Sequence, residues 1–99
     1  NRAYYAIFHA IKAILALEQV DFKKHSSVIA YFNKEYISKE IFPKELGRRI
    51  NEASFFREKS DYVDFYIVTK QESQMQIETA RLIIKEASEY IIKKLKETI

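Results

Sequence analysis

The chain opens on RAYYAIFH at residues 2–9, a stretch in which an arginine, two tyrosines and a histidine stand among apolar residues. The apolar residues of positions 1–18 recur at helical spacing around most of the circumference, which predicts a central, largely buried helix. An arginine in such a helix must meet a partner, a ligand or water, because a buried unpaired charge costs several kcal/mol. This stretch therefore indicates both a helical fold and a functional face.

Helical spacing continues through the rest of the chain, which holds one glycine and one proline and offers few strand or turn signals. We expect a second helix that Ser26 or Ser27 caps and that runs to about residue 38. His25, just before it, is expected to help the cap or to lie in solvent. Pro43 suits the first turn of a third helix.

A fourth helix is predicted over about 70–98, because Thr69 and Glu72 form a capping-box pattern at its start. The segment 61–68 before it is rich in aromatic and β-branched residues and is predicted to be a packed connector or a short strand. The expected core stripe of the fourth helix consists of Ile77, Ala80, Ile84, Ala87 and Ile91.

These elements predict an all-α, up-and-down bundle of four to five helices in a single domain, residues 1–99. The chain starts at Asn1, not methionine, and enters a helical pattern at once. This suggests a piece of a longer protein that lacks an N-terminal helix. A further helix or a second subunit would cover the central helix better.

Composition narrows the classes of function. The chain has no cysteine and two histidines, too few for a conventional zinc site, so we predict no metal and no cofactor. No apolar run approaches the roughly 20 residues that span a bilayer, so we expect a cytoplasmic protein without a membrane partner. The net charge of +3 is compatible with a phosphate-bearing partner.

A second stretch, FREKSDYVDF at residues 56–65, places an arginine on the apolar side of the third helix. The spacing is helical, so Arg57 continues the buried stripe of Leu46, Ile50 and Ala53. We expect Arg57 either to bind an anionic ligand or to form an internal ion pair, for example with Asp61 one turn later.

Three phrases together resemble a known family: RAYYAIFH at 2–9, HSSVIAYF at 25–32 and FREKSDYVDF at 56–65. In this order, over nearly the whole chain, they are similar to a small HEPN domain of the UPF0332 type. The resemblance implies a homodimer of up-and-down bundles, with one or two helices before Asn1 in a full-length member. It also implies pairing with a minimal nucleotidyltransferase, in a setting like that of toxin-antitoxin systems.

Many HEPN proteins are metal-independent ribonucleases in which an arginine is followed, four to six residues later, by a histidine. Histidine can take a proton from a ribose 2′-hydroxyl, and arginine can hold the scissile phosphate. By resemblance Arg57 takes the arginine position, but five residues later stands Tyr62, and tyrosine, with a pKa of about 10, is a poor base at neutral pH. The resemblance therefore implies phosphate binding by Arg57 more directly than catalysis.

The first helix offers a histidine, because Arg2 and His9 lie two turns apart and point in nearly the same direction. Tyr5 and Lys12 extend this line into a polar stripe. The stripe can bind phosphate and exchange a proton. Alternatively it is structural, paired with acids such as Asp61 or Asp64, or set against a partner subunit.

Three functions follow. The first is a nucleotide- or RNA-binding module with little intrinsic catalysis, whose nucleotidyltransferase partner supplies or modifies chemistry. The second is a metal-independent endoribonuclease that uses His9 with Arg2 or Arg57. The third is a helical dimerisation adaptor. The candidate catalytic residues are His9 and Arg57, and the candidate binding residues are Arg2, Tyr5, Lys12, Arg57, Asp61 and Tyr62.

Overall fold

The computed structural model describes residues 2–62 and 68–98, and the side chains of these residues apart from 60–62. This part of the chain is helical and contains no strand, which confirms the all-α class. The elements are α1 (Arg2–Ala16), α2 (His25–Phe32), the π-helix η1 (Asn33–Ile37), α3 (Lys44–Tyr62) and α4 (Lys70–Glu97). The connector predicted at 61–68 falls largely outside the described residues.

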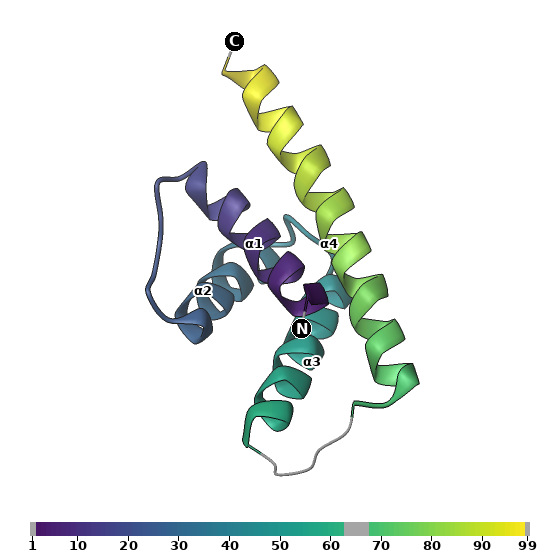
Figure 1. Ribbon diagram of the computed structural model, residues 1–99. Helices are drawn as coiled ribbons and strands as arrows, with labels where there is room; N and C mark the ends of the chain where they lie inside the picture. Colours follow the sequence, from purple (N-terminus) through teal and green to yellow (C-terminus); the bar gives the residue numbers. More distant parts are fainter. Residues whose placement is uncertain (1, 63–67, 99) are drawn as a thin grey trace.

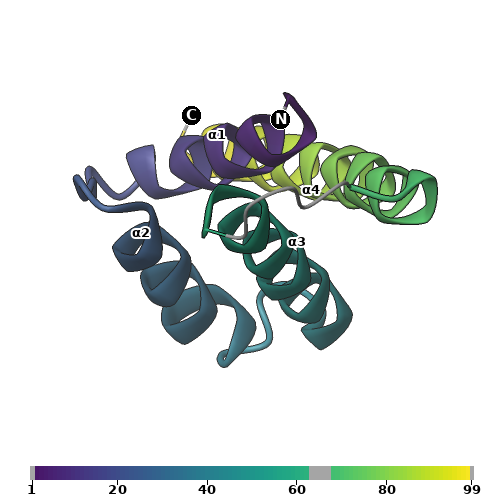
Figure 2. The same cartoon turned by 60° about the horizontal axis from the view of Figure 1, so that its bottom comes forward.

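The helices form two layers, with α1 and α4 side by side above α2 and α3 (Figure 2). Helix α1 contacts α2, α3 and α4, which confirms the prediction of a central helix. Helix α4 extends well beyond the other helices at its C-terminal end (Figure 1).

The core lies between the two layers and is built from branched aliphatic and aromatic side chains. Each large apolar side chain that is fully buried stabilises the fold by about 1.5–3 kcal/mol. The most completely buried side chains are Ile7, Ile11, Ile14, Leu15, Val28, Phe32, Tyr36, Leu46, Ile50 and Ile83.

Helix α2 begins two or three residues earlier than its serines suggested. Its N-cap is Lys24, which makes no side-chain cap hydrogen bond, so the prediction of a Ser26 or Ser27 cap is wrong. The extended backbone of Lys24 places its carbonyl to accept from the N–H of Val28 at 3.2 Å, which starts the helix without a side-chain cap. The helix then widens into η1, where the N–H of Ser38 donates to the carbonyl of Asn33, and ends near the predicted residue 38.

The junction between η1 and α3 explains the single glycine. A Cβ atom at Gly47 would lie 2.9 Å from Cγ2 of Ile37, closer than side-chain carbons pack. Helix α3 starts directly after Pro43, as predicted. Glycine therefore lets the start of α3 approach the π-helix closely.

Helix α4 has the predicted start and an unpredicted orientation. Thr69 and Glu72 form the complete capping box. However, Ile77 and Ile84 are 40% and 46% exposed, so the predicted core stripe is wrong at these two positions. The buried positions of α4 are Gln76, Thr79, Ala80, Ile83 and Ala87. Helix α4 has apolar residues on adjacent faces, and its packing on α1 and α3 determines which face is buried.

Candidate functional site

The arginine of the second stretch lies against the tyrosines of the first. Arg57 is half-buried on α3, and its Cζ lies 5.8 Å and 5.7 Å from the ring centres of Tyr4 and Tyr5. Its Nη2 donates a hydrogen bond of 3.3 Å to the Tyr5 hydroxyl. These distances are typical of cation–π contacts, which orient a guanidinium plane. The structure thus brings together two candidate residues that are 52 positions apart.

His9 lies beside Tyr5, the tyrosine that Arg57 also contacts. The two rings are roughly parallel, with centres 6.5 Å apart, and both side chains are exposed on α1. We name the surface formed by Tyr4, Tyr5, His9 and Arg57 the Arg57 surface. It places a guanidinium and an imidazole beside the same tyrosine ring, and these groups can bind a phosphate and exchange a proton.

The other members of the predicted stripe are arranged differently. Lys12 forms an ion pair of 3.1 Å with Asp21, and its Nζ lies 5.7 Å from the centre of the Phe8 ring. This ion pair lowers the pKa of Asp21, chiefly through the hydrogen bond from Lys12. Arg2 is exposed at the start of α1.

The remaining candidates, Asp61 and Tyr62, have side chains outside the described residues. The predicted pairing of Arg57 with Asp61 is therefore still a prediction. The same holds for Asp64, which was named as an alternative partner of the polar stripe.

His25 is a residue whose surroundings the sequence did not predict. It is exposed at the start of α2, but its ring stacks on Phe8 with centres 3.9 Å apart. Its Nδ1 lies 3.4 Å from the Tyr4 hydroxyl. No local sequence signal indicates this contact, because His25 and Phe8 lie on different helices and are 17 positions apart in the chain.

Tyr4 is the buried centre of this junction, with 4% of its surface exposed. Burial raises the pKa of its hydroxyl, whereas a hydrogen bond with Ser54 and the positive charge of Arg57 act in the opposite direction. The hydroxyl therefore connects α1 to Ser54 on α3 and to His25 on α2.

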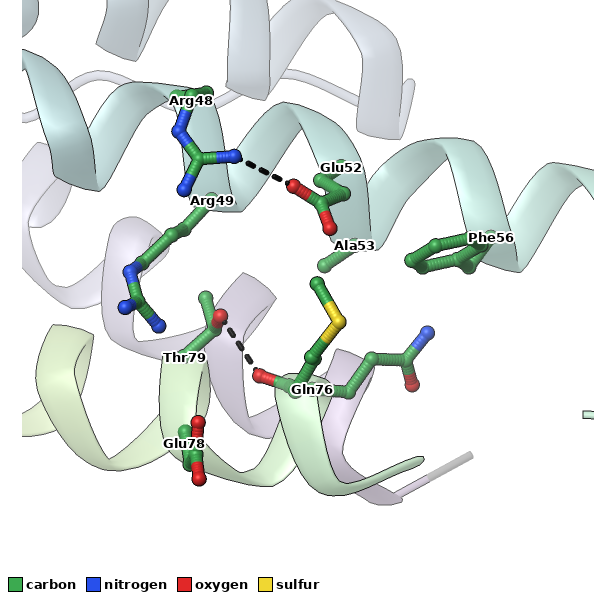
Figure 3. A pocket seen from close by; sticks show the side chains of 9 residues that line it. Arg48, Arg49, Glu52, Ala53, Phe56, Gln76, Glu78 and Thr79 are labelled. Carbon is green, nitrogen blue, oxygen red and sulfur yellow. Dashed lines mark hydrogen bonds and ion pairs between the residues drawn. The ribbon is translucent and has the colours of Figure 1, made fainter. Parts of the chain in front are cut away.

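A second site lies between α3 and α4, along the stretch of α3 from Arg48 to Phe56 (Figure 3). Its lining residues are Arg48, Arg49, Glu52, Ala53, Phe56, Met75, Gln76, Glu78 and Thr79.

Carboxylates hold the arginines of this α3–α4 pocket. Arg48 donates to Glu52 at 2.9 Å and also pairs with Glu45, and Nε of Arg49 lies 3.3 Å from Glu45. The hydrogen bond from Arg48 lowers the pKa of Glu45 to about 2. Carboxylates on the same helix therefore compensate the guanidinium charges of this pocket.

Two kinds of feature are absent from the described part of the chain. In the described ranges, no three histidine, aspartate or glutamate side chains are grouped so that they could hold a metal ion. None of the described helices combines the length and the hydropathy that are needed to cross a bilayer.

Comparison with known proteins gives a consistent family. The profile of the HEPN domain matches residues 1–91. Two Methanocaldococcus jannaschii proteins, named "Putative toxin MJ0142" and "Putative toxin MJ0605", are 32% and 34% identical over 94 and 98 residues. A Thermotoga maritima protein named "UPF0332 protein" is 40% identical over 62 residues.

These matches differ in extent. They cover 95%, 99% and 63% of this chain, respectively, but only 64%, 69% and 47% of the relatives' own lengths. No solved structure matches the chain significantly. The family profile, the helical fold and the order of the three phrases agree, and the chain belongs to the HEPN domain family, with relatives of the UPF0332 type.

Proposed function

We propose that this chain is a toxin-like HEPN module that binds the phosphate groups of RNA or of a nucleotide at the Arg57 surface. The observation that carries the proposal is the position of Arg57, whose guanidinium lies against the rings of Tyr4 and Tyr5 and one ring away from His9. Arginine binds phosphate through a planar fork of donors, and a preoriented fork loses less entropy on binding.

The aromatic setting favours ligand binding over a purely structural role. Tyrosine rings orient a guanidinium without neutralising its charge, so the rings themselves do not compete with a phosphate. His9 and Tyr5 are exposed beside it and can contact the same ligand. The net charge of +3 favours the approach of an anionic polymer.

The biological setting is part of the same proposal. Two relatives carry the word toxin in their names. We infer that this chain acts in a toxin-antitoxin-like system in the cytoplasm, as a homodimer that pairs with a minimal nucleotidyltransferase. Co-purification of the untagged chain with a tagged copy and with the nucleotidyltransferase from a neighbouring gene tests both partners.

The decisive experiment compares two arginines of α3. The affinity of the protein for a short fluorescein-labelled RNA of mixed sequence is measured by anisotropy at low salt. We expect Arg57→Ala to weaken binding about tenfold, as for the loss of one charge-assisted contact. The matched control is Arg49→Ala, which removes the same charge from the α3–α4 pocket and changes affinity by about twofold or less. Equal affinities of the two variants would contradict the proposal.

A second candidate function is a metal-independent ribonuclease, which the exposed position of His9 beside Tyr5 favours. In this case His9 takes the ribose 2′-hydroxyl proton while Arg57 or Arg2 holds the phosphate. RNA cleavage is measured with EDTA present for the wild type, His9→Ala and Arg57→Ala. Cleavage that falls in both variants establishes the ribonuclease, and no cleavage by a folded dimer supports the binding module.

The third candidate, a helical dimerisation adaptor, predicts a different result for the same variant. Arg57→Ala would then lower the stability or the dimer fraction and leave RNA affinity unchanged. Urea denaturation and analytical ultracentrifugation of Arg57→Ala, alongside the anisotropy measurement, separate this outcome from the others.

A further inference from the structure

We propose that His25 on α2 extends the Arg57 surface to a third helix. Its Nε2–H donates a hydrogen bond to a phosphodiester group of RNA that Arg57 holds. This inference rests on the proposed function, which it deepens by adding a residue and a helix to the site. It starts from the Tyr4 ring, whose centre lies 5.8 Å from Cζ of Arg57 and 6.1 Å from the centre of the His25 ring.

The first step is that His25 is held in place while remaining accessible. Its ring covers the buried ring of Phe8 at a centre-to-centre distance of 3.9 Å, yet the residue is exposed. Stacking on an aromatic ring fixes the plane of an imidazole without using its nitrogen atoms. Packing on Phe8 therefore determines the plane of the His25 ring, and the residue stays exposed.

The second step concerns which ring nitrogen of neutral His25 carries the proton. We assign Ser54 as the donor in its hydrogen bond with the buried Tyr4 hydroxyl, because a serine hydroxyl can rotate to suit its partner. The Tyr4 hydroxyl is then available to donate to Nδ1 of His25, at 3.4 Å. A histidine that accepts at Nδ1 carries its proton on Nε2 when neutral. This chain of hydrogen bonds from α3 through α1 to α2 presents an N–H donor outward.

The third step is the charge around the imidazole. In the part of the chain that the structure describes, no hydrogen bond engages Nε2 of His25. The groups that face the junction are Tyr4 from α1 and, through Tyr4, Arg57 and Glu58 from α3. A phosphate bound at Arg57 adds negative charge beside the ring, which strengthens the hydrogen bond from its N–H.

The experiment distinguishes a packing role of the His25 ring from a ligand contact made by its nitrogen atoms. His25→Phe keeps the stack on Phe8 and removes both nitrogens, so a packing role survives this change and a ligand contact does not. With the same labelled RNA, we expect His25→Phe to weaken binding about fivefold to tenfold. His25→Lys, which restores a donor and a positive charge, should recover affinity to within about twofold of the wild type. Far-UV circular dichroism confirms folding, and His25→Leu, which also lacks a donor, replaces His25→Phe if that variant does not fold.

Two controls make the result specific. Lys34→Ala removes an exposed positive charge from η1, the continuation of α2, and should leave affinity nearly unchanged. Tyr4→Phe removes the hydroxyl that positions His25, and its effect should shrink in the His25→Phe background, because both changes remove the same contact.

The outcomes distinguish this inference from the function on which it depends. If Arg57→Ala weakens binding while the folded variant, His25→Phe or His25→Leu, binds like the wild type, the role of His25 is refuted and the phosphate site at Arg57 stands. If RNA binding does not depend on Arg57, the proposed function fails and the inference fails with it.

Discussion

Helix α3 carries arginines at both ends, and their surroundings differ. At the N-terminal end Arg48 and Arg49 contact Glu45 and Glu52, which belong to the same helix. Toward the other end Arg57 lies against two tyrosine rings of α1. The first cluster is made by residues three and four positions apart, whereas the second is made by packing between helices.

The same residue type therefore has two kinds of surroundings on one helix. Carboxylates of the same helix compensate the charge of an arginine and add a few tenths of a kcal/mol to helix stability. Aromatic rings of another helix orient the guanidinium group of an arginine but carry no charge themselves. We therefore expect substitutions at the first cluster to affect stability slightly and substitutions at the second to affect ligand binding.

The largest expected effect comes from Ile50, which is buried on α3 between the two arginine clusters and is 1% exposed. Ile50→Ala removes three buried carbon atoms and leaves a cavity, so the free energy of unfolding should fall by about 3 kcal/mol. Urea denaturation measures this change. The control is Phe55→Ala, on the same helix but 58% exposed, which should change stability little. A loss below about 1 kcal/mol for Ile50→Ala would contradict the packing of α3 described above.

An intermediate effect is expected at Tyr5, which contacts Arg57 through both its ring and its hydroxyl. Tyr5→Ala removes the ring that orients the guanidinium, so RNA affinity should fall about fivefold, whereas Tyr5→Phe keeps the ring and should cost about twofold. Anisotropy with labelled RNA gives both values. If Tyr5→Phe and Tyr5→Ala lose affinity equally, the hydroxyl matters and the ring does not.

The smallest effect is a pH dependence at the charged end of α3. The pKa of Glu45 in the folded protein is lowered to about 2 by Arg48, below the value of 4.5 for a free carboxyl group. A lowered folded-state pKa adds stability above the unfolded-state value, and this stability is lost as the pH falls from about 4.5 toward 2. The wild type should therefore be slightly more stable than Glu45→Gln at pH 7, and the two should converge near pH 2.

Thermal denaturation across this pH range, at low and high salt, tests the prediction. Because Glu45 and Arg48 are well exposed, added salt should reduce the difference between the wild type and Glu45→Gln. A difference that persists at pH 2 would show that the substitution acts through something other than the charge of Glu45. RNA affinity at pH 7 should not change in Glu45→Gln.

The candidate site was partly visible in the sequence. Helical spacing placed Arg57 on the buried stripe of α3 and aligned Tyr5 with His9 on α1, and the structure brings these three residues together. It does not bring Lys12 into the same group, because Asp21 in the turn after α1 pairs with it. His25 is exposed, in agreement with one of its two predicted roles, but its stacking contact was not predicted because Phe8 lies on another helix.

The sequence by itself determined what depends on neighbours along the chain. Helical periodicity gave the four helices, Thr69 and Glu72 gave the start of α4, and three- and four-residue spacings gave the charge pairs of α3. Each of these signals comes from groups within about one helical turn of one another.

Only the tertiary structure decided which faces meet. It left Ile77 and Ile84 on the surface, although their spacing fits a core stripe as well as that of the buried Ala80 and Ala87. It also placed Arg57 on Tyr5, across 52 residues. The physical reason is that a helix with apolar residues on adjacent faces can rotate between them at little local cost, and the packing of its neighbours selects the orientation.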